Sequence, residues 1–139
     1  MQKIAEEIEK FRLSRDLVAI FLLAQQLKEI AEKDHNDYYM TIACYHIANY
    51  YFNCGNYQKS LSFAIEGVTF GKIISEHFCL IQLYNLIGMV YGTVGDEINS
   101  VQYMLKAYYE AKANKIVRYT FNITNNLGVL FYDLEYYDI

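Results

Sequence analysis

The segment IGMVYGTVGDE, residues 87–97, places three glycines in a stretch that otherwise has the pattern of a helix interior. Each glycine in a helix interior costs roughly 1 kcal/mol relative to alanine, so some other constraint must favour small residues here. The segments IANYYFNCGNY at 47–57 and LGVLFYDLEYY at 127–137 align with it at a spacing of 40 residues. The chain therefore contains an internal repeat, and a repeat of this length is typical of stacked helical units.

Three columns recur through the aligned segments. They are small at Ala48, Gly88 and Gly128, aromatic at Tyr51, Tyr91 and Phe131, and glycine at Gly55 and Gly95 before Glu135 breaks the column. A helix needs a small residue where the backbone of a neighbouring helix crosses it closely, and packing there outweighs helix propensity. We therefore expect the small-residue column, meaning Ala48, Gly88 and Gly128, to lie where two helices approach each other.

The residues between these columns predict pairs of helices. Each period divides into two amphipathic stretches with apolar residues at three-and-four spacing. The expected turns combine a left-handed glycine with a capping side chain at Gly55-Asn56 and Gly95-Asp96, and helix-starting side chains at Asn36-Asp37 and Ser75-Glu76. The predicted helices span residues 2–13, 16–33, 38–53, 57–74, 77–93, 97–114 and 118–133.

These features predict an all-α protein. We expect a right-handed α-solenoid of antiparallel helix pairs with about seven helices, because no strand pattern of useful length is present and no proline interrupts a helix. The whole of 1–139 is expected to form one domain. Its predicted repeats cover about 1–37, 38–76 and 77–117, with an incomplete repeat at 118–139.

The composition indicates a folded protein and argues against several classes of partner. Of the 139 residues, 54% are hydrophobic and 20% are charged, which lies outside the range of disordered chains. The net charge is −4 and the lysines and arginines are dispersed, so we expect no nucleic-acid partner. The apolar run Leu17 to Ala24 is too short to cross a membrane, and the first ten residues lack a secretory signal. The predicted location is the cytoplasm, without membrane association.

No arrangement of residues in the sequence predicts catalysis, a metal site or a cofactor. Cysteines at Cys44, Cys54 and Cys79 match no zinc or disulfide framework, so each is interpreted as a small buried hydrophobe. No ligand spacing connects the three histidines, which are His35, His46 and His77. Glu6 and Glu7 are expected at a helix start, where acidic side chains favour the helix dipole.

The repeat columns resemble the tetratricopeptide repeat, a helix pair with a small residue and a large aromatic on its first helix, a glycine in the turn and small residues on its second helix. The matching positions are Ile47, Ala48, Tyr51, Gly55, Tyr57 and Ala64; Tyr84, Ile87, Gly88, Tyr91, Gly95 and Ala107; and Leu127, Gly128, Phe131 and Tyr137. The period exceeds the usual thirty-four residues and the closing proline is missing, which predicts a longer second helix. Long-period repeats of this kind resemble those of bacterial cytosolic regulators. That resemblance implies binding of peptides or proteins by a sensor region that precedes an output domain, such as a diguanylate cyclase (GGDEF) domain.

The last repeat lacks its second helix, because Tyr137 aligns with Tyr57, where a second helix starts. A solenoid normally ends in a polar capping face. This end would instead expose the apolar residues Leu127, Leu130, Phe131 and Leu134. We therefore expect the chain to be an N-terminal piece of a larger protein, with this interface covered by the downstream part or by a second copy in a homodimer.

The first helix of each period is expected to line the concave surface, where such arrays hold their ligands. No Asp, Glu, Lys or Arg occurs from Tyr38 to Gln58 or from His77 to Gly95. The predicted peptide-binding residues are Tyr45, His46, Asn49, Phe52, Asn53, Gln82, Asn85, Met89, Asn122, Asn125, Asn126 and Tyr132. Asparagine pairs with peptide units and tyrosine adds contact area, so we expect an uncharged or backbone-dominated peptide or protein segment as the ligand. The alternative is that these are ordinary exposed residues with no dedicated ligand.

The sequence therefore predicts a non-catalytic sensory or regulatory module of a bacterial signalling protein that binds a peptide or protein segment. The alternative function is an oligomerisation scaffold that dimerises a downstream enzymatic domain through the surface at Leu127 to Leu134. A third hypothesis, that the full-length protein is an enzyme such as a cyclic-dinucleotide synthase or a kinase, is neither supported nor excluded by these residues. The sequence specifies no ligand, output domain or oligomeric state.

Overall fold

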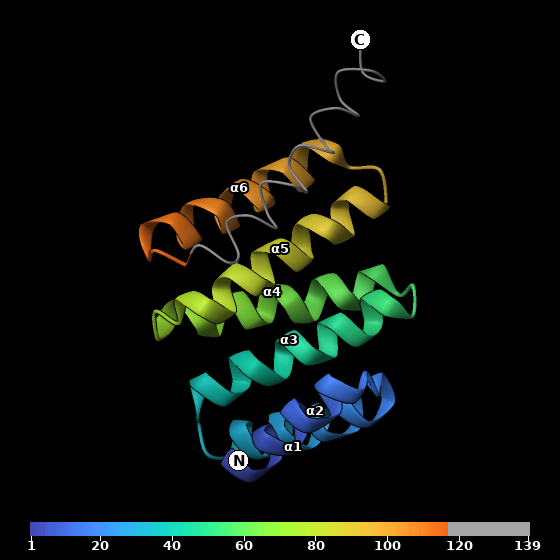
Figure 1. Cartoon of the computed structure of the whole chain (residues 1–139), viewed down its shortest axis with the longest axis vertical. Coiled ribbons are helices and arrows are strands. Elements are labelled where there is room, and N and C mark those ends of the chain that lie inside the picture. The colour runs from blue at the N-terminus through green and yellow to red at the C-terminus, as the bar shows by residue number, and fades with distance from the viewer. Residues whose placement is uncertain (117–139) are drawn as a thin grey trace. The chain divides into compact units, whose positions relative to one another are not determined.

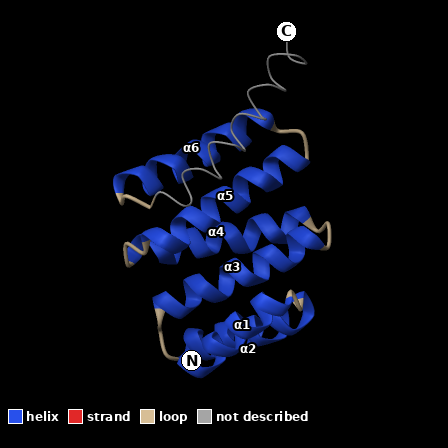
Figure 2. Cartoon of the chain, in the orientation of Figure 1, coloured by secondary structure: helices blue, strands red, loops and turns tan. Residues whose placement is uncertain are grey.

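The computed structural model describes residues 1–116, which fold into six α-helices joined by short turns (Figure 1). The helices are α1 Gln2–Ser14, α2 Leu17–Lys33, α3 Asp37–Asn53, α4 Tyr57–Ile73, α5 His77–Thr93 and α6 Glu97–Ala113. Figure 2 shows that the described residues hold helices and loops but no strand. The all-α prediction is confirmed for this part of the chain, and each of the six predicted helices begins and ends within one residue of its observed bounds. The seventh predicted helix, 118–133, lies outside the described residues.

The chain divides into two compact units at Glu76 and His77. In the first unit α2 packs against α1 and α3, and α3 packs against α4, so helices adjacent in the sequence are neighbours in space. In the second unit α5 packs against α6. The division falls where the sequence places the boundary between its second and third repeats. No helix within residues 1–116 has both the length and the apolar character needed to cross a membrane.

The turns between the helices all have the same geometry. The backbone adopts the left-handed conformation at Arg15, His35, Gly55, Ser75, Gly95 and Lys115, once every twenty residues. After α2, for example, the amide of His35 bonds the carbonyl of Glu32 at 3.3 Å and the amide of Asn36 bonds that of Ala31 at 2.9 Å. This pair of bonds is the Schellman motif, which satisfies carbonyls that a helix end leaves free. Each period of forty residues therefore contains two similar helix-and-turn units.

The residue after each left-handed position also starts the next helix in four turns. The side-chain oxygens of Asp16, Asn36, Asn56 and Asp96 each accept a hydrogen bond from the amide three residues later, at 3.0 to 3.2 Å. This confirms the predicted caps at Asn36, Asn56 and Asp96.

Two expectations about helix starts were wrong. Ser75 was expected to begin a helix, but it occupies the left-handed position with φ 54°, equivalent to Gly55, and α5 begins two residues later. Glu6 and Glu7 were expected at a helix start. Because α1 begins at Gln2 and has no acidic residue in its first turn, these two carboxylates lie beyond the helix start.

The two helix pairs α3–α4 and α5–α6 repeat their internal contacts at a spacing of forty residues. The buried Ser60 hydroxyl donates to the carbonyl of Ala48 at 2.8 Å, and the buried Ser100 hydroxyl donates to the carbonyl of Gly88. Aromatic stacking repeats as well, with ring centroids 5.8 Å apart in Tyr51–Phe63 and 5.7 Å apart in Tyr91–Tyr103. Ala48 and Gly88 thus occupy equivalent places, as predicted. Gly128, the third member of the column, lies outside the described residues.

The small-residue column marks the close approach of two helices, as predicted. A β-carbon added at Gly88 would lie 2.7 Å from Cγ of Met104 and 3.1 Å from the carbonyl oxygen of Ser100. The residue equivalent to Met104 in the preceding pair is Ala64, which faces the larger column member Ala48. The side-chain volume is therefore shared differently in the two pairs. Gly88 faces the large Met104, whereas the larger Ala48 faces the small Ala64.

The first pair of helices has larger residues at the equivalent positions. Ile8 and Ile20 stand where Ala48 and Ser60 stand in the second period, and both belong to the buried cluster at the centre of the first unit. Apolar packing therefore replaces the serine-to-carbonyl hydrogen bond between α1 and α2. This substitution explains why the first period is hard to recognise from the repeat columns.

Replacing Gly88 with alanine is expected to destabilise the protein by about 1–2 kcal/mol, because overpacking against Met104 and Ser100 outweighs the gain in helix propensity. Met104→Ala is expected to cost about 2–5 kcal/mol through the cavity it leaves. The double variant restores the residues found at the equivalent positions, Ala48 and Ala64. The double variant is therefore expected to lose less stability than the two single variants together, by at least about 1 kcal/mol. Urea unfolding followed by circular dichroism measures all three values.

The matched control is Ile98→Ala, which removes an exposed side chain of α6 and is expected to change stability by less than about 0.5 kcal/mol. Additive costs in the double variant would contradict the proposed exchange of volume between Gly88 and Met104.

The shared turn geometry predicts opposite effects at two positions of the first unit. Gly55→Ala is expected to destabilise by about 1 kcal/mol, because a β-carbon meets nothing within 4 Å and the cost comes from the left-handed backbone alone. His35→Gly is expected to stabilise by about 0.5 kcal/mol, since relief of the left-handed strain exceeds the added flexibility of the unfolded chain. Thermal and urea unfolding of both variants check the two signs. A loss of stability in His35→Gly would show that its side chain contributes more than its backbone costs.

Candidate functional site

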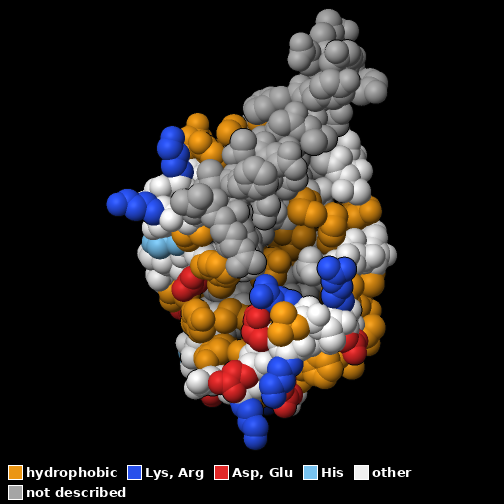
Figure 3. All heavy atoms as spheres, in the orientation of Figure 1, with side chains coloured by type: hydrophobic (Ala, Val, Ile, Leu, Met, Phe, Trp, Pro, Cys, Tyr) orange, Lys and Arg blue, Asp and Glu red, His pale blue; other side chains and the backbone are white. Residues whose placement is uncertain are grey.

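A pocket of about 360 Å³ lies between α1 and α3, the first helices of two successive pairs. We call it the α1–α3 pocket. Four residues of α1 and four of α3 line it, namely Gln2, Ala5, Glu6 and Glu9, and Tyr38, Tyr39, Ile42 and His46. The α1 residues recur at intervals of three and four, so they share one face of that helix. Figure 3 shows acidic side chains among apolar ones on a face of the first unit.

The α1 side of the pocket supplies two carboxylates with different surroundings. Glu9 pairs with Arg12 at 3.1 Å, and both side chains are more than half exposed. Glu6 accepts only a long hydrogen bond of 3.4 Å from the amide of Gln2. Within residues 1–116 no lysine, arginine or histidine forms an ion pair with Glu6. The pocket therefore contains one carboxylate that is not neutralised by a side chain of the described structure.

The α3 side supplies rings and one apolar side chain. Tyr38 and Tyr39 meet edge to face with their centroids 5.1 Å apart, so one tyrosine edge lies against the ring of the other. Tyr39 and Ile42 also pack against the buried cluster of the first unit, which fixes their positions. The hydrogen bond from the Tyr39 amide to the Asn36 side chain fixes the start of the helix beneath them. This wall of the pocket is therefore preformed.

His46 lines the pocket from α3 and is only 8% exposed. Its ring meets that of Tyr45 edge to face at 5.1 Å, and in the described part of the chain it makes no hydrogen bond. Burial, with a further contribution from the positive charge of Arg12, lowers the pKa of His46 to about 4. The imidazole is therefore neutral at ordinary pH and offers one donor and one acceptor nitrogen.

Three of the four α1 residues of the pocket occupy columns that the sequence assigned to ligand binding. Ala5, Glu6 and Glu9 stand forty residues before Tyr45, His46 and Asn49, all three predicted as peptide-binding. Of the predicted residues themselves, only His46 lines this pocket. The pocket residues missed by the sequence analysis are Gln2, Ala5, Glu6, Glu9, Tyr38, Tyr39 and Ile42. Extending the forty-residue register backward from the predicted columns would have found three of them on α1.

The remaining predicted residues lie at positions of differing exposure. Tyr45, Asn49, Phe52, Gln82, Asn85 and Met89 are partly buried, and Asn53 is exposed with its amide donating to the carbonyl of Asn49 at 2.7 Å. The other four predicted peptide-binding residues, Asn122, Asn125, Asn126 and Tyr132, lie outside the described residues. So do the predicted interface residues Leu127, Leu130, Phe131 and Leu134.

Asn85 in the second unit has an unusual hydrogen-bonding state. Its amide nitrogen donates to the sulfur of Met89 at 3.8 Å, while its side-chain oxygen is buried and has no partner in the described structure. An unpaired buried acceptor is unfavourable by about 1–3 kcal/mol, so this oxygen is suited to receive a donor from a ligand.

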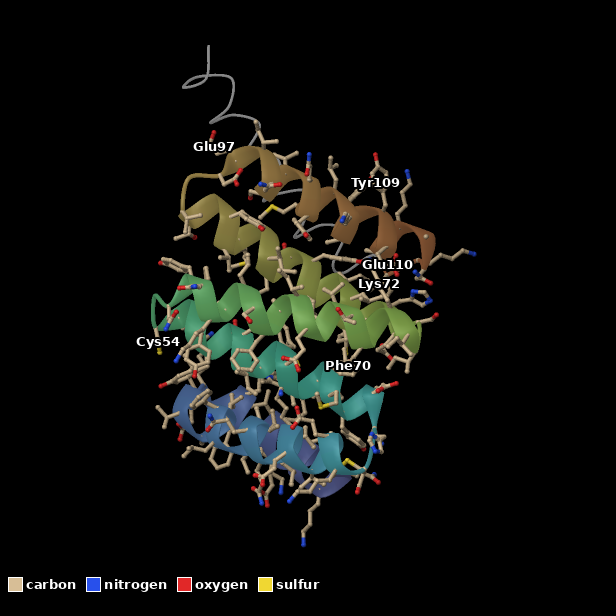
Figure 4. All side chains as sticks on the ribbon, turned by 180° about the vertical axis from the view of Figure 1, so that it is seen from behind. Cys54, Phe70, Lys72, Glu97, Tyr109 and Glu110 are labelled. Carbon is tan, nitrogen blue, oxygen red and sulfur yellow. The ribbon has the colours of Figure 1, made fainter. Side chains whose placement is uncertain are left out.

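The other candidate groups have structural roles or none that the structure defines. Cys44 and Cys79 are buried, as predicted, and burial raises the pKa of the Cys44 thiol to about 12. Cys54 is exposed in the turn after α3, so its predicted burial was wrong (Figure 4). His77 pairs with Glu110 at 2.8 Å and joins the start of α5 to the end of α6. Among residues 1–116 no three His, Cys, Asp or Glu side chains are arranged to hold a metal ion.

The low pKa of His46 predicts that acid destabilises the fold. Its unfolded pKa is near 6.5 and its folded pKa is about 4, so the unfolded chain binds the proton first and stability falls as pH drops through this interval. Lowering the pH from about 7.5 to about 5 is expected to cost roughly 2 kcal/mol through this group. His46→Phe should flatten the dependence while keeping a ring, whereas His35→Asn, at an exposed turn, should leave it unchanged. Urea unfolding at both pH values provides the measurement, and an unchanged pH dependence in His46→Phe would refute the assignment.

No protein-family model matches the chain, and a search of curated proteins gives no significant match. The fold class therefore rests on the observed helices and their repeated contacts. The similarity to the tetratricopeptide repeat remains a prediction from the repeat columns.

Proposed function

We propose that this chain is a non-catalytic module of tetratricopeptide-like helix pairs that binds a peptide or protein segment on the face formed by its first helices. The observation that supports this most directly is the α1–α3 pocket, because three of its four α1 residues stand in the columns that the repeat assigns to ligand binding. A repeat protein uses equivalent positions of successive units for one surface. The pocket is therefore the concave part of the proposed ligand-binding surface.

The proposed array is a right-handed solenoid. The contacts of Ser60 with Ala48 and of Ser100 with Gly88 support it, because two successive pairs then share one internal geometry. Both pairs also consist of helices of 17 residues, as a regular repeat array requires. A sensory or regulatory role follows if an attached domain responds to occupancy of the surface.

The dimensions of the pocket favour a peptide side chain as the bound group. Ligand pockets for whole small molecules run from about 300 to 1,000 Å³, and 360 Å³ is near the lower limit. One large side chain fits such a volume while the remaining peptide lies along the helices. Partly buried Asn49, on α3, carries an amide suited to peptide groups.

A random heptapeptide library selected on the immobilised chain tests this proposal. Selected peptides are expected to bind in solution, and Ala5→Tyr, which fills the pocket, is expected to weaken them roughly tenfold or more by removing the buried contact. Isothermal titration calorimetry measures the affinity. Leu22→Ala is the matched control, since Leu22 is exposed on α2 and does not line the pocket, and its affinity is expected to stay within about twofold of wild type.

Failure to select any peptide, or equal binding to wild type and Ala5→Tyr, would contradict the proposed site. Circular dichroism of Ala5→Tyr checks that α1 remains folded, so that a loss of affinity reports on the pocket.

A further inference from the structure

The geometry points to a lysine or arginine side chain of a basic peptide as the group that enters the α1–α3 pocket. This inference rests on the proposed peptide-binding function and specifies the chemistry of the ligand. It differs from the uncharged ligand expected from the sequence, because that expectation considered the neutral first helices of later repeats and omitted α1.

The charge of the pocket favours a cation. Glu6 has no cationic partner within residues 1–116, and Glu9 shares its charge with the exposed Arg12. The side chains of Glu6 and Glu9 are both exposed, so each attracts a positive group and repels a negative one with the modest strength of a surface charge. An apolar side chain would offer Glu6 no hydrogen bond.

The hydrogen-bonding groups of the pocket also select a donor. His46 is nine-tenths buried, lines the pocket and has no hydrogen-bond partner in the described structure. Ammonium and guanidinium groups carry only donors, and they match the two carboxylates and the acceptor nitrogen of the imidazole. The ring is kept neutral because burial and the positive charge of Arg12 both lower its pKa, and it can accept one hydrogen bond from a donor group of the ligand.

The tyrosine rings on the α3 side of the pocket also favour a cation. Tyr38 and Tyr39 present rings on the α3 side, and a cation over a tyrosine face is stabilised by the ring quadrupole. The chain already uses such contacts, with the Lys59 ammonium 5.3 Å from the centre of the Tyr51 ring and the Lys106 ammonium 4.7 Å from that of Tyr103. Carboxylates, an acceptor nitrogen and aromatic faces together suit a cationic side chain on an aliphatic stem.

Nuclear magnetic resonance titration of the whole chain tests the side-chain preference without knowledge of the natural peptide. The probes are the acetylated, amidated forms of arginine, lysine, norleucine and glutamate. Arginine and lysine are expected to shift the signals of Glu6, Glu9 and the His46 ring, with dissociation constants about fivefold lower than that of norleucine, the upper end of the range for one exposed charge pair. Glutamate is expected to cause no shift at these positions.

Two variants of equal net charge separate a local effect from a general change in charge. Glu6→Gln is expected to weaken arginine binding about fivefold, whereas Glu7→Gln on the same helix, which does not line the pocket, is expected to leave it within about twofold. Raising the sodium chloride concentration to about 0.5 M should reduce the difference between wild type and Glu6→Gln, because salt screens the pair. Equal effects of Glu6→Gln and Glu7→Gln would overturn the inference.

The outcomes distinguish this inference from the proposed function. If the selected heptapeptides bind at the pocket but lack lysine and arginine, the cationic preference is wrong and peptide binding stands. If no selected peptide is blocked by Ala5→Tyr, peptide binding at this site fails. Spermidine tests a free polyamine as the source of the cation, and tighter binding of spermidine than of every selected basic peptide would overturn the assignment to a peptide.

Discussion

The close approach of the two helices in the pairs α3–α4 and α5–α6 is the constraint on which these pairs depend. At Ala48 and Gly88 the first helix has no large side chain, so a serine hydroxyl of the second helix reaches the backbone carbonyl of the first. Without a small residue the backbones could not come this close, and without the hydroxyl a buried carbonyl would lose a partner. Small column members are thus selected by a backbone contact. That is why the helix tolerates glycine where propensity opposes it.

Turns of the same geometry repeat this contact at a spacing of forty residues. Helices α2 to α6 each contain 17 residues, and each turn fixes one left-handed residue, so positions forty apart have equivalent places within their own helix pairs. Equivalent positions of two first helices can then line the same pocket. Glu6 stands in the column of His46, and both line the α1–α3 pocket from their own helices. The repeat therefore positions the candidate site as well as the core.

Sequence periodicity was sufficient for the helices because apolar spacing and turn residues agree at almost every boundary. It was insufficient at Ser75, where a side chain typical of a cap occupies the left-handed position instead, and at Cys54, which lies in a turn although cysteine usually favours the interior. The α1 wall was missed for a different reason. The predicted ligand-binding columns were listed for the later periods and were not extended to α1, where Ile8 and Ile20 replace the small residue and the serine of the later pairs. Burial and hydrogen-bond partners depend on tertiary contacts, which one-dimensional spacing does not specify.

The distribution of charge along the first helices bears on how a ligand would be oriented. Within the columns, α1 presents Glu6 and Glu9 where α3 presents the neutral His46 and Asn49. A peptide bound under our proposal would therefore meet carboxylates at one end only. Because a basic residue is favoured there and nowhere equivalent on α3, binding in the reverse direction would leave Glu6 without its partner. A surface built from repeated positions has no inherent direction, and a charge confined to its first helix supplies one.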